Sequence, residues 1–271
     1  MKMLLRIAFL IAPAFFNVTQ AATLKPGSLI IGSDLSYPPY NFLKEDKPAG
    51  FDTEFINLIS APLKLKPVVK DTRFANLILG LKSNKFDVIA STLYVTPERA
   101  QQVDFLPYMK TGGTLLVAAN SAFQPKKPED LCGKRVSSIK GGAWIARLNA
   151  VSTHYCQPKG LGAISVREFP TSPEATQALL SAAVDVQYED AAVAKATLEK
   201  TAQRLKISSD EMIYPVVVGL AVNKDNPQLL NELKASFAQK VSDGSYRALL
   251  QKYNLQMPDA NEAEKALAGT L

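Results

Sequence analysis

Short apolar runs and helical repeats alternate along the first part of the chain. Phe51, Phe55 and Ile59 recur at four-residue spacing, which is typical of the buried face of an amphipathic helix. Short apolar runs bounded by polar residues are typical of buried strands instead. The pattern predicts strands over 29–32, 65–69 and 86–90 and helices over 52–61 and 76–82. Such alternation favours an α/β fold in which helices cover a parallel sheet.

Two longer apolar runs, 114–119 and 216–222, enclose a second alternation of strands and helices. Its strands are predicted over 135–139, 164–168 and 184–188, and its helices over 143–151, 174–181 and 190–200. We interpret residues 118–217 as an inner lobe inserted into a discontinuous outer lobe, residues 22–117 and 218–271. The two long runs would then be the crossover strands and the hinge. A single domain with one long sheet is the alternative, but it leaves both runs without a role.

The end of the chain returns to the outer lobe. Asn226 and Pro227 are suited to the N-cap and first position of a helix, and Asp243-Gly244 would end it. A shorter helix is predicted over 245–253. Residues 258–271 are rich in alanine and glutamate, which fits either an accessory helix or a frayed tail.

The N-terminus has the pattern of a secretory signal. Lys2 and Arg6 precede an apolar run over 7–16 that is too short to span a membrane comfortably, and small residues follow. We expect residues 1–21 to be a signal peptide cleaved after Ala21. No cysteine lies near that position, so we expect a free periplasmic protein without a lipid anchor.

Cysteine usage agrees with export. Cys132 and Cys156 are the two cysteines, and an even count in an exported protein predicts a disulfide, which would contribute about 3–4 kcal/mol for a loop of this size. His154 is the single histidine, so the chain lacks the four ligands of a structural zinc site. We expect neither a metal nor a cofactor.

The charge distribution excludes one class of partner. The net charge is +6, from 31 lysine and arginine against 25 aspartate and glutamate residues, and the lysines are scattered. Nucleic-acid binding would need a sustained basic stripe with stacking aromatics. We expect no nucleic-acid partner.

Arg99 is the first candidate for binding chemistry. Thr96 and Pro97 are suited to begin a helix there, and the hydroxyl residues Ser91 and Thr92 follow the strand before it. Arg99 therefore lies just beyond the carboxyl end of a strand, where open α/β sheets bind ligands. A guanidinium at that place can hold a carboxylate through two parallel hydrogen bonds. The alternative is an exposed arginine in a solvated ion pair, and spacing alone does not decide between them.

A series of short motifs resembles the polar-amino-acid family of periplasmic solute-binding proteins, the extracytoplasmic receptors of ABC importers. The resemblance extends over residues 27–255. In chain order the motifs are Gly32-Ser33-Asp34, Tyr37-Pro38-Pro39-Tyr40, Gly50-Phe51-Asp52, Phe86-Asp87-Val88-Ile89, Thr96-Pro97-Glu98-Arg99, Val103-Asp104-Phe105, Leu131-Cys132-Gly133-Lys134, Val184-Asp185 with Asp190, and Asp243-Gly244-Ser245-Tyr246. The resemblance implies a two-lobed type II periplasmic binding protein fold. Each lobe would hold a mostly parallel sheet flanked by helices, and two crossover strands would join the lobes.

The resemblance also implies a set of ligand-binding residues. Arg99 would hold the α-carboxylate of an amino acid and Asp190 its α-ammonium, while Asp190 also suits the N-cap of the helix that follows. Glu189 beside it is expected to face solvent, from the alternation of the strand. Asp34 would face the ligand's side chain, which disfavours acidic ligands. The remaining residues of the predicted site are Tyr37, Phe74, Ser91, Thr92, Tyr94 and Gly142; Phe74 suits the core equally well.

Two positions depart from the family's pattern. Tyr94 stands where the family has a small hydroxyl residue or glycine, which would shorten the pocket or add a phenol. Gly141-Gly142-Ala143 replaces the usual Gly-Thr-Thr turn, although glycine N–H groups at a helix start can still bind a carboxylate. Trp144 follows, and it either lines the cleft or packs the helix.

The function expected from these residues is reception rather than catalysis. A polar or cationic L-amino acid would be captured by cleft closure and delivered by a monomeric receptor to an inner-membrane ABC permease. A secreted cyclohexadienyl dehydratase on the same fold is one alternative, which would need a positioned proton donor. A sensor subunit for a signalling partner is the other.

Overall fold

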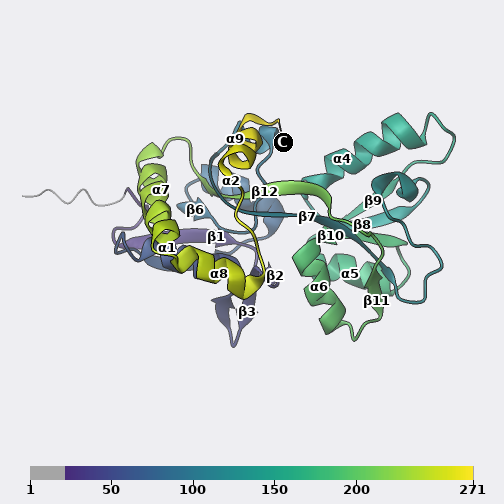
Figure 1. The fold of residues 1–271 in the computed structure, drawn as a ribbon, viewed down its shortest axis with the longest axis horizontal. Coiled ribbons are helices and arrows are strands. Elements are labelled where there is room, and N and C mark those ends of the chain that lie inside the picture. The colour runs from purple at the N-terminus through teal and green to yellow at the C-terminus, as the bar shows by residue number, and fades with distance from the viewer. Residues whose placement is uncertain (1–21, 271) are drawn as a thin grey trace, which may run out of the picture.

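A computed structural model describes residues 22–270, so the predicted signal peptide of residues 1–21 lies outside the described residues. Two lobes lie side by side, joined by the long strands β7 (Asp104–Ala118) and β12 (Ile213–Val222) (Figure 1). In the described part of the chain, no helix is both long and apolar enough to cross a membrane. The predicted α/β fold of two lobes joined by crossover strands is confirmed.

One continuous sheet runs through both lobes. Its strand order is β5-β1-β6-β12-β7-β10-β8-β9, with β11 (Leu205–Ile207) beside β7. The outer-lobe strands are β1 (Ser28–Ser33), β5 (Lys66–Asp71) and β6 (Val88–Ile89), and the inner-lobe strands are β8 (Arg135–Ile139), β9 (Ser165–Phe169) and β10 (Val186–Asp190). Pairing is parallel within each of these sets and antiparallel wherever β7 or β12 takes part. Each lobe is therefore a mostly parallel sheet.

Strand β7 changes partners at Gly113. From Asp104 to Gly113 it pairs with β12, and from Gly113 to Leu116 it pairs with β10. A side chain at Gly113 would collide with the Tyr188 phenol, so glycine at this position leaves room for the phenol against β7. The lobe boundaries at residues 117/118 and 217/218 stay a prediction.

Helices cover the sheet as the apolar repeats predict. Those of the outer lobe are α1 (Phe51–Ser60), α2 (Leu77–Lys82), α3 (Pro97–Ala100), α7 (Pro227–Ser242), α8 (Ser245–Tyr253) and α9 (Ala260–Ala268); those of the inner lobe are α4 (Trp144–Val151), α5 (Ser172–Leu180) and α6 (Ala191–Lys200). The predicted N-caps Thr96, Asp190 and Asn226 each accept a backbone N–H of their helix. Each helix start depends on a hydrogen bond between residues close in sequence, which explains why the sequence predicts it.

Two features needed the structure, and one prediction is tested by it. A small antiparallel sheet of β2 (Ser36–Tyr37), β3 (Asn41–Lys44) and β4 (Lys47–Ala49) was not predicted, because its strands are short and largely polar. The C-terminal segment forms an accessory helix, α9, which begins at a capping box of Asp259 and Glu262. The predicted disulfide between Cys132 and Cys156 is confirmed, with a Cα–Cα distance of 5.3 Å.

Candidate functional site

A small cavity between the lobes gathers eight of the nine residues predicted for the site. The outer lobe contributes Asp34, Tyr37, Phe74, Ser91, Thr92, Tyr94 and Arg99, and the inner lobe contributes Gly142 together with Ile139, Ala143 and Trp144. Asp190 does not line this cavity. Trp144 does, so of its two predicted positions it takes the one at the cleft.

The cavity is nearly closed. The centre of a water molecule can occupy only about 10 Å³ of it, which is room for about one water. Pockets that hold small ligands are usually ~300 Å³ or larger. An amino acid therefore enters only if the lobes separate, and the crossover strands β7 and β12 are the connections about which they would move.

Arg99 is buried without an acidic partner. Its side chain extends from α3 and the residue is 8 % exposed. Nη1 donates to the Tyr94 carbonyl at 2.8 Å, and Nη2 donates across the lobes to the Gly141 carbonyl at 3.0 Å. Burial lowers the pKa of Arg99 to about 10. No described carboxylate forms an ion pair with it, so the alternative of a solvated ion pair is wrong for residues 22–270.

A guanidinium has five N–H donors, of which two have carbonyl partners here. Its carbon lies 5.4 Å from the centroid of the Phe74 ring, so Phe74 forms a wall of the cavity. Arg99 lines the cavity, and an anion from outside the chain that entered between the lobes would be a charge-assisted partner for the remaining donors.

The Gly141-Gly142 turn contributes less than expected. The Gly142 N–H is already bonded to the Ile139 carbonyl at 3.2 Å, so it is not free for a carboxylate. The role of Gly142 is steric, because a Cβ there would lie 2.8 Å from the Trp144 indole. Trp144 in turn donates from Nε1 to Ser138 Oγ at 2.5 Å, which fixes the indole against the cavity.

Asp34 lines the cavity with its charge already paired. Its carboxylate accepts the Phe74 N–H at 2.8 Å and the Ser36 hydroxyl at 2.6 Å, and it lies 3.1 Å from Arg73 Nη1. The expectation that Asp34 acts on the ligand as a free negative charge is therefore weakened. Its first role is to tie the β1–β2 loop to the turn before α2.

Ser91 and Thr92 hold the cavity's loops in place. Ser91 Oγ accepts the Asp34 N–H at 3.0 Å. Thr92 donates from both its N–H and its hydroxyl to Asp52, at 2.6 and 2.9 Å. Asp52 is fully buried and also accepts from Tyr108. From the sequence Asp52 is recognisable only as part of the Gly50-Phe51-Asp52 motif, because its position beside Thr92 depends on long-range packing.

Asp190 lies behind Tyr94 and is fully buried. It accepts two N–H groups of α6, at 2.9 and 3.4 Å, as its predicted N-cap role requires. It also accepts the hydroxyls of Tyr40 at 3.0 Å, Tyr94 at 2.8 Å and Thr111 at 2.7 Å. Burial raises the pKa of Asp190, and these hydrogen bonds oppose the rise. Tyr94 thus separates this carboxylate from the cavity.

The expectation that Glu189 faces solvent is wrong, because Glu189 is fully buried. Alternation predicts an exposed face only at a sheet surface, whereas β10 is covered on both faces. Its carboxylate accepts from Tyr37 of the outer lobe at 2.7 Å and from Ser172 and Gln187 of its own lobe. Burial raises the pKa of Glu189 to about 7.

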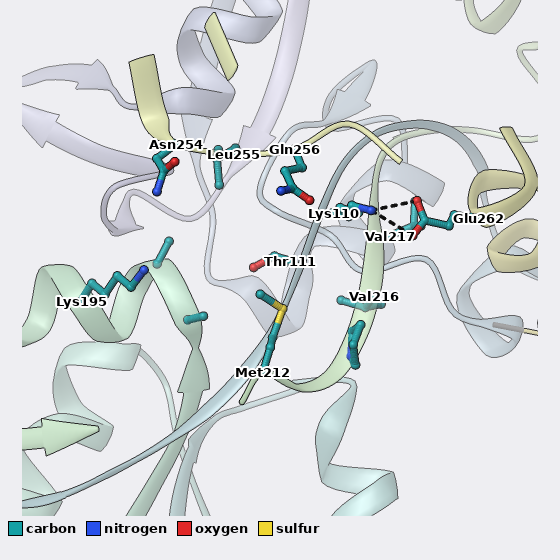
Figure 2. Close-up of a pocket in the computed structure, with 13 residues that line it drawn as sticks. Lys110, Thr111, Lys195, Met212, Val216, Val217, Asn254, Leu255, Gln256 and Glu262 are labelled. Carbon is teal, nitrogen blue, oxygen red and sulfur yellow. Dashed lines mark hydrogen bonds and ion pairs between the residues drawn. The ribbon is translucent and has the colours of Figure 1, made fainter. Parts of the chain in front are cut away.

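A larger cavity lies on the hinge strands beside the C-terminal segment, where Figure 2 shows Lys110 bound to Glu262 at 3.0 Å. Water centres can occupy about 420 Å³ of it. It shares no lining residue with the Arg99 cavity, and its lining in the described chain carries no carboxylate other than the paired Glu262. Of the two cavities, only the smaller is lined by Arg99 and by the other predicted site residues.

Comparison with known proteins shows the family of the chain. The profile described as bacterial extracellular solute-binding proteins, family 3, matches residues 29–256, which is most of the chain. The chain belongs to this family. The resemblance inferred from its short motifs is confirmed.

Two curated relatives of this solute-binding protein bind amino acids according to their names. The chain is 27 % identical over 229 residues to the L-cystine-binding protein TcyJ of Escherichia coli strain K12, covering 84 % of this chain and 82 % of the relative. It is 26 % identical over 260 residues to the histidine-binding periplasmic protein of the same strain, covering 93 % and 96 %.

Two solved structures share the fold. An ancestral arginine-binding protein bound to arginine has a TM-score of 0.77 at 30 % identity, covering 84 % of this chain and 98 % of that chain. An ancestral amino-acid-binding protein described as a precursor of cyclohexadienyl dehydratase has a TM-score of 0.72 at 30 % identity, covering 84 % and 95 %. Members of this family that the chain resembles are therefore mainly binding proteins.

Proposed function

We propose that this solute-binding protein captures an L-amino acid between its lobes, with Arg99 holding the α-carboxylate. One observation carries the proposal: Arg99 is buried at the cleft and forms no ion pair with a carboxylate of residues 22–270, although the charge of the neighbouring Glu98 acts on it. A buried cation without a counter-ion is costly, and the carboxylate of a ligand would offset that cost through paired hydrogen bonds.

Capture would proceed by hinge closure. The ligand would enter while the lobes are apart and would first meet the outer lobe, which holds seven of the predicted site residues. Closure would bring Gly141 and Trp144 of the inner lobe over the ligand. The hydrogen bond from Arg99 to the Gly141 carbonyl already joins the two lobes at this place. A closed form that differs from the open form offers a partner a distinct surface to bind.

The ligand class that fits best is a polar or cationic amino acid. Asp34 and the hydroxyl groups around it are hydrogen-bond acceptors, although Arg73 offsets part of the Asp34 charge. The names of the relatives, which include binding proteins for cystine, histidine and arginine, point the same way.

Membership of the family supports the cellular setting that we propose. The chain would be exported by residues 1–21, act in the periplasm as a monomer and deliver its ligand to an inner-membrane ABC permease. A sensor partner in place of the permease is the alternative, and the proposed clamp would serve it equally well.

A dehydratase is the second candidate, favoured by the likeness to a dehydratase precursor. Such an enzyme needs a proton donor at the substrate. Glu189 has a raised pKa, but Tyr37 lies between it and the cavity, and the lining carboxylate Asp34 is paired with Arg73. Binding without catalysis is therefore the better-supported function.

A thermal-shift and calorimetry panel tests the proposal. The full-length precursor, expressed for export, would be screened against the common L-amino acids, cystine and prephenate. We expect at least one polar or cationic amino acid to raise the melting temperature, with glutamate and aspartate at least tenfold weaker, which is about 1.4 kcal/mol. Binding of prephenate alone, with release of a decarboxylated product, would establish the enzyme instead.

A further inference from the structure

We propose that Tyr94 receives the α-ammonium group of the ligand directly and that Asp190 acts through it. Tyr94 would thereby be a specificity-determining residue, and Asp190 a positioning residue behind it. The inference rests on the proposed function, because it takes the ligand to be an amino acid held at its carboxylate by Arg99.

Tyr94 lies between the cavity and Asp190. Tyr94 lines the cavity, whereas Asp190 does not and is fully buried. The Tyr94 hydroxyl donates to Asp190 Oδ2 at 2.8 Å. A ligand that enters between the lobes therefore meets the Tyr94 side chain before it meets the Asp190 carboxylate.

Saturation of Asp190 is the second argument. A carboxylate offers about four lone-pair sites. Asp190 already accepts five donors: two N–H groups of α6 and the hydroxyls of Tyr40, Tyr94 and Thr111. A direct contact with an ammonium group would have to displace one of these donors, and a donor left without its acceptor in a buried place is destabilising.

Restraint of Tyr94 is the third argument. Its backbone pairs with Val218 of the hinge strand β12, and its carbonyl accepts Arg99 Nη1 at 2.8 Å. Its ring lies edge-on to Trp144, with centroids 5.6 Å apart, and Trp144 stacks on Tyr188 at 5.1 Å. Tyr94 thus positions the Arg99 guanidinium through its carbonyl and carries the phenol itself. The distance between the two groups that would bind the ends of a zwitterion is therefore set by this one residue.

The phenol has the right chemistry for the contact. After donating its hydrogen to Asp190, the oxygen keeps lone pairs that can accept an ammonium N–H. Burial and the nearby Asp190 charge raise the pKa of Tyr94, so the phenol stays neutral. The negative charge of Asp190 would then act on the ligand through a polarised hydroxyl.

Paired ligands test the inference by calorimetry. L-histidine, L-glutamine, L-arginine and L-cystine would each be compared with the analogue that has hydrogen in place of every α-ammonium group. For the wild-type protein we expect the analogue to bind at least tenfold more weakly. In Tyr94→Phe the ring still covers Asp190 but lacks the acceptor. The ratio of the two dissociation constants, analogue over amino acid, should therefore fall below threefold.

Two further variants separate the role of Tyr94 from that of its neighbours. Tyr40→Phe removes another hydroxyl from Asp190 without touching the cavity, and it should change both ligands of a pair alike. Tyr94→Ser opens a direct path to Asp190, and it should keep or increase the wild-type ratio.

The outcomes distinguish this inference from the proposed function. A wild-type ratio that persists in Tyr94→Phe, or one that collapses in Tyr94→Ser, would show that Tyr94 is not the contact. If the wild-type protein binds none of the four amino acids, both the proposed function and this inference are wrong.

Discussion

At one end of the cleft Arg99 is buried with no acidic partner, whereas at the other end Asp190 and Glu189 are buried among donors that satisfy both. Arg99 reaches only two backbone carbonyls. The two carboxylates instead accept hydroxyl groups from Tyr37, Tyr40 and Tyr94 of the outer lobe. The cationic end thus lacks a counter-charge, and the acidic end has its partners built into the chain.

This contrast indicates which interactions stabilise the closed lobes and which bind the ligand. Hydrogen bonds from tyrosines to buried carboxylates stabilise the closed lobes by themselves. The ligand adds what is missing, an anion at Arg99. Binding energy would therefore be concentrated at the cationic end, and the acidic end would adjust the closure equilibrium.

Removing the cation should give the largest effect. Arg99→Ala leaves the ligand carboxylate without its partner in a closed site, and loss of one member of such a pair costs about 2–5 kcal/mol at interfaces. The dissociation constant measured by calorimetry should rise at least about thirtyfold. Arg147→Ala is the matched control, because Arg147 is an exposed guanidinium on α4 outside the cavity. Equal losses in the two variants would contradict the contrast.

Neutralising the acidic end should reduce ligand affinity less than removing the cation does. Asp190→Asn keeps a good N-cap for α6 and keeps an acceptor for the tyrosines, but removes the negative charge. Amino-acid affinity should fall about tenfold, or 1.4 kcal/mol, in calorimetry.

The control for this loss is Asp259→Asn, which makes the same change at the N-cap of α9, away from the cavity. An Asp190→Asn loss as large as that of Arg99→Ala would mean that both ends bind the ligand with equal strength.

Glu189 should make stability depend on pH. Its pKa of about 7 in the folded protein lies above the ordinary value, so the folded state holds a proton that the unfolded state has released. This stabilisation is complete below the unfolded pKa and is lost as pH rises through about 7. Urea titrations should give an unfolding free energy about 1 kcal/mol lower at pH 8 than at pH 6.

Glu189→Gln is the control for the pH effect, since it removes the titrating group and keeps the acceptor for Tyr37. The side chains packed against Glu189 are Tyr37, Ser172, Gln187 and the neighbouring Asp190. The same pH dependence in wild type and variant would show that it does not arise from Glu189.

The smallest effect is expected at Asp34. Arg73 is 36 % exposed, and surface ion pairs of this kind contribute about 0.2–1 kcal/mol. Arg73→Gln should therefore leave the Asp34 carboxylate without its counter-charge. The preference for glutamine over glutamate should then increase by about twofold in competition titrations. Arg147→Gln again serves as the control, and a decrease in that preference would show that Asp34 does not act on the ligand.

Local chemistry explains what could be predicted. The helices after Thr96, Asp190 and Asn226 begin where their caps predict, because capping depends on neighbouring residues alone. The strand β7 begins before the predicted run 114–119, since Pro107, Thr111 and two glycines interrupt its apolar pattern. Pairing with β12 compensates for that interruption.

The sequence by itself determined most of the order of strands and helices, the disulfide and the family, because these depend on periodicity, composition and motif spacing; the short strands β2, β3 and β4 were not predicted. Only the tertiary structure decided how the charges are partnered. Arg73 reaches Asp34 from the turn before α2, and Tyr94 reaches Asp190 from the other lobe. Likewise Glu189 is buried because α5 and α6 pack against β10, all five residues of which are buried. The energy of a buried charge depends on the groups that folding brings within hydrogen-bond distance, and sequence spacing does not contain that information.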